Sequence, residues 1–236
     1  MIKTEHVQSL HFGVNFVLAP LPEQELTDDR ARKFLNDLAD GGLGIDKFER
    51  KGAESKWEFS RRGEPGPLII VVGKTGPQVG QILITAPQPA RSLDLFIREA
   101  EAACTAFLAA WPRKYQVVHR DVCLRRLFPT EGEHAFAYVW ETLLGKNQDD
   151  LKPFGNQVFG GGLRIVAVPS DGEGQIQEAK IESFLRDPSK LFVEVQWAWN
   201  KPLESSERID PKDVLEKVNA YATEKVQEFL GPLGDV

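Results

Sequence analysis

The sequence predicts an α+β fold of two similar β-α-β-β-β-α halves, residues 1–114 and 115–236. Several short segments alternate between apolar and polar residues, as half-buried strands do. Two long segments place apolar residues every three or four positions, as amphipathic helices do. The order of segments repeats after about 113 residues, which indicates an internal duplication. Each half is expected to form an antiparallel sheet with one face covered by its long helix. The two sheets could also join edge to edge as one continuous domain.

In the first half, Thr27-Asp28-Asp29 is the expected start of a helix, with acids in its first turn, that ends at Gly41-Gly42. A second helix carries an apolar stripe from Leu93 to Trp111, and Pro112 ends it. Residues 73–77 are interpreted as a hairpin turn. Strands are expected at residues 7–18, 56–61, 68–72 and 79–85.

In the second half, Thr130 and Glu133 are expected to form a capping box. The helix that follows should bury the face from Phe136 to Leu144. Asp210-Pro211 is a typical helix start, and the last helix carries an apolar stripe from Val214 to Leu230. Strands are expected at residues 115–128, 163–168, 175–185 and 191–199.

Composition restricts the class of protein. The chain has 236 residues, of which 42% are hydrophobic, enough for a core without disulfides or metals. The net charge is −6, and all of it lies in residues 115–236, because residues 1–114 are balanced. An acidic chain is a poor binder of nucleic acid, since phosphates are contacted by clustered Lys and Arg. The only local basic cluster is Lys56, Arg61, Arg62 and Lys74.

Other features predict a cytoplasmic location. The two cysteines, Cys104 and Cys123, do not form a C-x-x-C motif, and we expect both to be free thiols in a reducing compartment. The N-terminal residues lack the apolar region of a signal peptide. No apolar run approaches the roughly 20 residues that a membrane-spanning helix needs. We therefore expect no membrane association.

The layout resembles a sporadically distributed, functionally uncharacterised bacterial family of about 250 residues. The strand from Val117 to Phe128, with Arg120, Arg125 and Arg126, and the terminal helix carry this resemblance. The resemblance implies a cytosolic bacterial protein, often part of a small mobile gene cluster such as a defence system. It implies no site residues.

Two short motifs suggest catalysis but lack the context that it needs. Gly73-Lys74-Thr75 is not preceded by the glycine of a phosphate-binding loop and is not followed by a helix. His119-Arg120-Asp121 is similar to a kinase catalytic loop, but Arg126 stands where that loop needs asparagine. The histidines show no metal-ligand spacing. We therefore predict no catalytic residue, no cofactor and no metal.

Six residues are candidates for binding a ligand or a partner. His119, Asp121 and Arg125 should share one face of a strand, where they form either an acid–base and anion-orienting group or an ordinary solvated face. Trp197 and Trp199 share a strand face, and with Trp57 they either pack in the core or contribute to an interface.

The favoured interpretation is a non-enzymatic protein-binding or assembly component that recognises a protein partner or a second copy as a homodimer. A second interpretation is a small-molecule-binding protein or enzyme, with a pocket between sheet and helices lined by the six candidates. A third is nucleic-acid binding on the concave sheet face.

Overall fold

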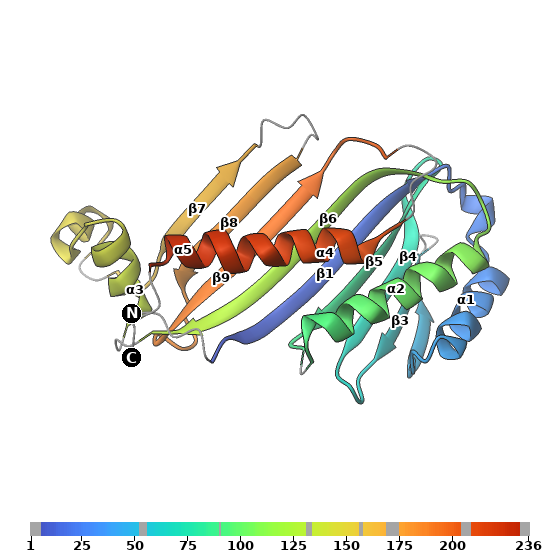
Figure 1. The fold of residues 1–236 in the computed structure, drawn as a ribbon, viewed down its shortest axis with the longest axis horizontal. Coiled ribbons are helices and arrows are strands. Elements are labelled where there is room, and N and C mark those ends of the chain that lie inside the picture. Colours follow the sequence, from blue (N-terminus) through green and yellow to red (C-terminus); the bar gives the residue numbers. More distant parts are fainter. Residues whose placement is uncertain are drawn as a thin grey trace.

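The computed structural model describes residues 6–51, 56–89, 91–130, 134–155, 158–168, 175–203 and 209–231. These residues form one large antiparallel sheet of nine strands, with helices packed against one of its faces (Figure 1). The class is therefore α+β, as predicted. None of the helices in the described ranges is both long enough and apolar enough to cross a membrane.

The first half contains five strands and two longer helices. Helix α1 starts at the predicted place, and Thr27 caps it, because its Oγ1 accepts a hydrogen bond from the Arg30 amide. Ser92 caps α2 in the same way. The elements are β1 (Gln8–Ala19), the 3-10 turn η1 (Glu23–Glu25), α1 (Asp28–Asp40), β2 (Lys47–Arg50), β3 (Lys56–Arg61), β4 (Leu68–Gly76), β5 (Val79–Pro87) and α2 (Leu93–Ala110).

The second half contains four strands and one longer helix, α4. Asp210 caps α4 and proline occupies its first turn, as predicted. The elements are β6 (Gln116–Pro129), α3 (Ala135–Ala137), the π-helix η2 (Tyr138–Leu143), the 3-10 helix η3 (Gln148–Phe154), β7 (Gly162–Ala167), β8 (Gln175–Ser183), β9 (Lys190–Trp199), α4 (Pro211–Tyr221), the π-helix η4 (Ala222–Val226) and α5 (Gln227–Phe229).

The strands are ordered β2-β3-β4-β5-β1-β6-β9-β8-β7. The first strand of each half, β1 or β6, therefore lies at the centre, and the two pair along nearly their whole length. This pairing makes residues 1–114 and 115–236 parts of a single sheet. The outermost strands are β2 from the first half and β7 from the second.

One core lies between the sheet and its helices. Alternate residues of β1 (Phe12, Val14, Phe16 and Leu18) are fully buried beneath α2. In the second half, α4 crosses β6 and β9 and buries Val214, Leu215 and Val218. The apolar stripes predicted for both helices are thus the surfaces that cover the sheet.

The structure corrects two local predictions. Strand β2 was not predicted, because Lys47-Phe48-Glu49-Arg50 contains a single apolar residue. The predicted capping box of Thr130 and Glu133 lies partly outside the described residues, which end at Thr130 and resume at His134; both the amide and the hydroxyl of Thr130 donate to the Ser189 carbonyl. The segment from Phe136 to Leu144 is mostly π-helix.

The predicted hairpin turn at residues 73–77 is also shorter than expected. Strand β4 continues to Gly76, and only Pro77 and Gln78 turn the chain toward β5. Gln78 adopts a φ of 56°, in the left-handed region that tight turns use.

A buried charged triad joins α2 to the sheet. Glu99 on α2 accepts from Arg61 on β3 and from Arg91, each at 2.5 Å, and all three side chains are almost fully buried. Both guanidinium groups also donate to backbone carbonyls, Arg61 to Gly66 and Arg91 to Pro67. Such a group is costly to bury, and removing one partner leaves uncompensated charge.

We expect Glu99→Ala to lower the free energy of unfolding by about 3–5 kcal/mol, because two buried guanidinium groups lose their carboxylate. Urea unfolding at pH 7 measures this change. Glu101→Ala is the matched control, because Glu101 is exposed on the same helix. Equal and small losses in the two variants would contradict the role given to the triad.

Candidate functional site

The three candidate tryptophans lie in the core, on the helix-covered face of the sheet. Trp57 is fully buried on β3, and its indole N–H donates to Asp28 of α1 at 3.2 Å. Trp197 and Trp199 pack edge to face on β9, with ring centroids 5.6 Å apart. Tyr221 of α4 lies against Trp197. These tryptophans are therefore packing residues, and four strands separate Trp57 from the other two.

The polar candidates lie on the opposite face, which the helices leave open. A bulge in β6 omits Val118 from the pairing with β1, so Val117 and Val122 both face the core while His119 and Asp121 face away from it. The six candidates therefore do not line one pocket, because the three tryptophans and the three polar residues lie on opposite faces of the sheet.

His119 and Asp121 do interact, as their shared face predicted. The Asp121 carboxylate contacts His119 Nε2 at 3.1 Å and accepts from the Asn15 amide at 2.9 Å. The other ring nitrogen of His119 lies 2.9 Å from the Asn200 side-chain oxygen. Arg125 is not part of this cluster, because it pairs with Glu194 on β9.

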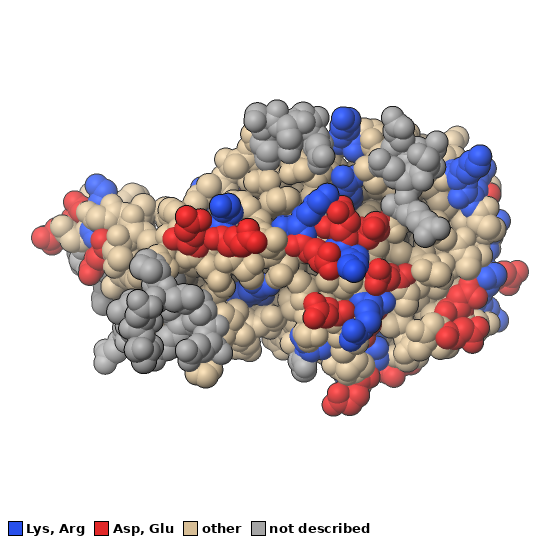
Figure 2. Space-filling model, viewed as in Figure 1, with Lys and Arg blue, Asp and Glu red and all other residues tan. Residues whose placement is uncertain are grey.

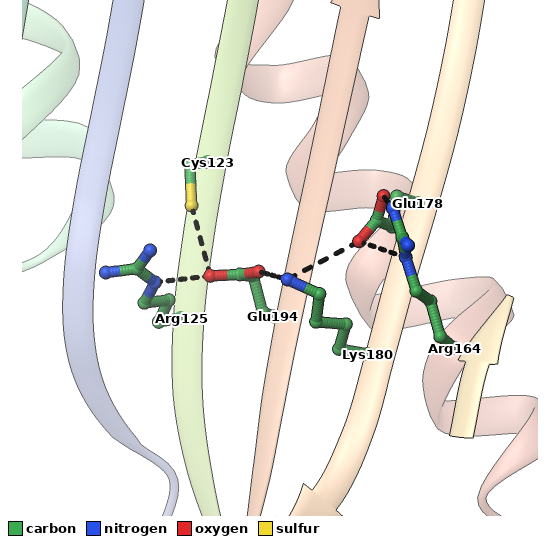
Figure 3. A network of polar contacts seen from close by, with 6 residues as sticks. All are labelled: Cys123, Arg125, Arg164, Glu178, Lys180 and Glu194. Carbon is green, nitrogen blue, oxygen red and sulfur yellow. Dashed lines mark hydrogen bonds and ion pairs between the residues drawn. The ribbon is translucent and has the colours of Figure 1, made fainter. Parts of the chain in front are cut away.

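A larger polar network runs across four strands of the open face (Figure 3). Glu194 is at its centre and accepts from Arg125 at 2.5 Å and from Lys180 at 2.8 Å. Lys180 also contacts Glu178, and Glu178 binds Arg164 of β7 through two hydrogen bonds, of 2.9 and 2.7 Å. The charges alternate along this chain of contacts, so each has an opposite neighbour.

Sequence analysis identified only Arg125 among these residues. The signal that could have found others is the alternation of Glu178, Lys180 and Glu182, which places three charges on one face of β8. The strand neighbours of that face could not be known without the sheet order.

The electrostatics of the open face favour fixed charges over reactive groups. Burial would raise the pKa of Glu194, but hydrogen bonds from Lys180 and Arg125 outweigh it, so this pKa lies below its usual value. Burial and the neighbouring Arg125 lower the pKa of His11 to about 4, so its ring is neutral at pH 7. Burial, helped by Glu194, raises the pKa of Cys123 to about 12. Cys123 is therefore a protonated thiol and not a nucleophile.

The basic cluster proposed for nucleic acid is dispersed. Arg61 is buried in the triad with Glu99, and Lys74 pairs with Glu23 at 2.8 Å. In the described part of the chain, no group of three or more His, Cys, Asp or Glu side chains is placed to hold a metal ion.

Exposed apolar side chains concentrate in one stretch of the chain, where they lie on both faces of the sheet edge: Ile165 is opposite the core residue Ala179, and Val166 is opposite Glu178 of the open face. Of nine exposed large hydrophobic residues in the described ranges, seven lie in residues 154–185, around β7. On the helix-covered face, charged side chains concentrate along α4 and around α1 and α2, whereas the area over β7 and β8 is mostly uncharged (Figure 2). The opposite face of β7 and β8 carries Arg164, Glu178 and Lys180. We call the seven the β7 surface: Phe154, Phe159, Ile165, Val166, Val168, Ile176 and Leu185.

A hollow of about 480 Å³ adjoins the β7 surface. Phe184, Leu185 and Phe192 give it an apolar wall, while Gly160 and Gly161 leave its side toward β7 without side chains. Glu182 and Arg186 lie at its margin. The candidate site is thus this edge of the sheet, where exposed apolar side chains adjoin a hollow. Sequence analysis did not identify it.

We expect Glu194→Gln to lower the free energy of unfolding at pH 7 by about 2 kcal/mol, because two charged hydrogen bonds are weakened. The pKa of Glu194 is depressed on folding, so its contribution is present above pH 4.5 and is lost as the pH falls through the lower folded value. Urea unfolding at several pH values should therefore show the two proteins converging below pH 4.5. A constant difference would contradict this assignment.

We expect both thiols to resist iodoacetamide at pH 8 in the folded protein, because burial raises the pKa of Cys104 and of Cys123. Mass spectrometry should find rapid modification only after unfolding in urea. Fast labelling of folded protein that Cys123→Ser abolishes would instead identify an activated thiol.

Comparisons with known proteins provide no assignment. No family model matches the chain, and no curated protein matches it. Among solved structures, the chain is similar to the di-domain ARO/CYC StfQ from the steffimycin biosynthetic pathway, at 10% sequence identity and a TM-score of 0.21. The match covers 91% of this chain and 93% of that one. A TM-score this low supports no inference about fold or function.

Proposed function

We propose that this chain is a non-enzymatic protein-binding component of an assembly, and that the β7 surface is where it binds. The observation that carries the proposal is the concentration of exposed apolar side chains at one end of the sheet. Large apolar patches on otherwise polar proteins mark interaction surfaces. The tryptophan strand does not contribute, because Trp197 and Trp199 are buried.

The two edges of the sheet support the same proposal by their difference. An exposed edge strand invites pairing with another chain, and charged residues prevent this. Edge strand β2 carries Lys47, Glu49 and Arg50 among its four residues. Edge strand β7 has a single charged residue, Arg164, and this residue already pairs with Glu178. An edge protected in this way at β2 and left apolar at β7 is consistent with a partner that covers β7.

The polar groups on the open face support a non-enzymatic role. The network around Glu194 pairs each charge with an opposite one, and Cys123 is held protonated. Charges held in such pairs stabilise the sheet and are not poised to exchange protons with a substrate.

We further propose that the two halves arose by duplication. The order β1-β5-β4-β3 on one side of the centre corresponds to β6-β9-β8-β7 on the other, and each half closes with a helix, α2 or α4. The resemblance to a sporadically distributed bacterial family suggests that the assembly belongs to a cytosolic bacterial system, with defence as one such context.

The hollow beside the β7 surface favours a second candidate function, the binding of a small apolar molecule. Its volume of about 480 Å³ lies within the range of ligand sites. A small molecule that co-purifies with the chain, in the absence of any larger complex, would support this alternative over the first.

The protein-binding proposal predicts that the chain at native abundance elutes from gel filtration of a host extract as a complex heavier than 26.4 kDa. Val166→Lys should shift it to the position of the single chain, because Val166 is 53% exposed on β7 and a lysine there would have to be desolvated. Leu108→Lys is the control, since Leu108 is also exposed but lies on α2. Elution of the wild type as a single chain, or of both variants as the complex, would contradict the proposal.

A further inference from the structure

A polar hollow of about 640 Å³ lies where helix α2 begins, and we call it the α2 hollow. Its lining comes from the start of β1, from the segment that follows β5 and from the first residues of the helix. Every polar side chain in the lining can donate a hydrogen bond, and none is a carboxylate. These side chains are Gln8, Ser9, Gln88, Arg91 and Ser92.

The N-terminus of α2 is one source of positive potential in the hollow. Ser92 lines the hollow and is the N-cap of this 18-residue helix. Its Oγ accepts from the Leu95 amide at 3.3 Å, so its hydroxyl proton is left to donate. The amides of the first turn lack partners within the helix, and the helix dipole makes this end positive. The acid of the first turn, Asp94, is exposed and is not part of the lining.

Arg91 is an independent indication of a ligand. It lines the hollow, only 8% of the residue is exposed, and its Nε is buried without a hydrogen-bond partner in the part of the chain that the structure describes. Most buried donors in folded proteins have an acceptor. The triad of Arg61, Arg91 and Glu99 also contains two guanidinium groups and one carboxylate, so one positive charge is in excess. Burial lowers the pKa of Arg91 even though Glu99 raises it.

A second guanidinium group without a carboxylate lies next to the lining. Arg126 of β6 pairs with Ser9 of β1, and paired residues share a face of the sheet. Arg126 donates to the Asn219 side-chain oxygen of α4. Burial lowers the pKa of Arg126, and no charged neighbour offsets this effect. An anion in the hollow is therefore attracted by two positive charges that the described residues do not neutralise.

We propose that the α2 hollow binds an oxyanion, a phosphate or carboxylate group carried by a small polar molecule. The Ser92 hydroxyl and the first amides of α2 hold the oxyanion, as helix N-termini do in many phosphate sites. The excess charge of the buried triad stabilises it. Sites of this volume hold whole small molecules, and Gln8, Ser9 and Gln88 provide hydrogen-bonding groups for the remainder.

The test is a titration of the purified full-length chain with inorganic phosphate, measured by isothermal titration calorimetry at constant ionic strength. Sodium acetate is titrated in parallel, to distinguish a phosphate site from a carboxylate site. We expect saturable binding of one of these anions. Ser92→Asp should raise its dissociation constant at least about tenfold, because aspartate also caps a helix but places a negative charge where the oxyanion binds.

Thr27→Asp is the matched control. Thr27 is the N-cap of α1, so this variant has the same net charge as Ser92→Asp and also keeps its helix cap. The dissociation constant of the anion should be unchanged in this variant. Circular dichroism checks that both variants are folded.

Binding of neither anion to the wild type would overturn the inference, and so would an equal loss of affinity in the two variants. Binding of acetate but not of phosphate, with the same dependence on Ser92, would support the site and identify the group as a carboxylate. The inference goes beyond the proposed function. Strands β6, β9 and β8 lie between β1 and β7, so neither result bears on protein binding at the β7 surface.

Discussion

The pairing of β1 with β6 is the interaction on which the rest of the structure depends. These strands begin the two halves and lie at the middle of the sheet, so their backbone hydrogen bonds join residues that are more than a hundred positions apart. Because the junction is continuous, α2 and α4 cover the same face and share one core. A protein of two separate sheets would have two more edges to protect, whereas this arrangement leaves only β2 and β7.

A sheet that helices cover on one face must stabilise the side chains of its other face without a second hydrophobic core. Here the open side does so with cross-strand charge pairs centred on Glu194 and with the Asn15–Asp121–His119 cluster. Alternating charges hydrate well and also hold neighbouring strands in register. The proposed binding site lies instead at the end of the sheet, around β7, where exposed apolar side chains concentrate.

The functional proposal follows from the difference in charged residues between the two edge strands, β2 and β7. Natural sheets protect an exposed edge with charge, and β2 follows this practice while β7 does not. An exposed apolar edge strand promotes aggregation of a monomer, whereas in an assembly a partner can cover it. Gly160 and Gly161, which precede β7, line a hollow together with Phe184 and Phe192.

The sequence by itself determined the α+β class, the start of α1, α2 and α4, and the position of eight of the nine strands, because helical and strand periodicities are local properties. Strand β2 was not predicted because it has too few apolar residues to show alternation. The π-helical form of residues 138–143 has no sequence signal. Sequence also placed His119 and Asp121 together, since two residues apart on a strand share a face.

Only the tertiary structure decided which face and which edge each residue occupies. The alternation of Trp197 and Trp199 shows that they share a face, but not that α4 covers it. Arg125 meets Glu194 because β6 lies beside β9, and Arg164 meets Glu178 because β7 lies beside β8. Edge position depends on the order of all the strands, which is set by long-range pairing between distant segments. The exposure of β7 could therefore be known only once the whole sheet was assembled.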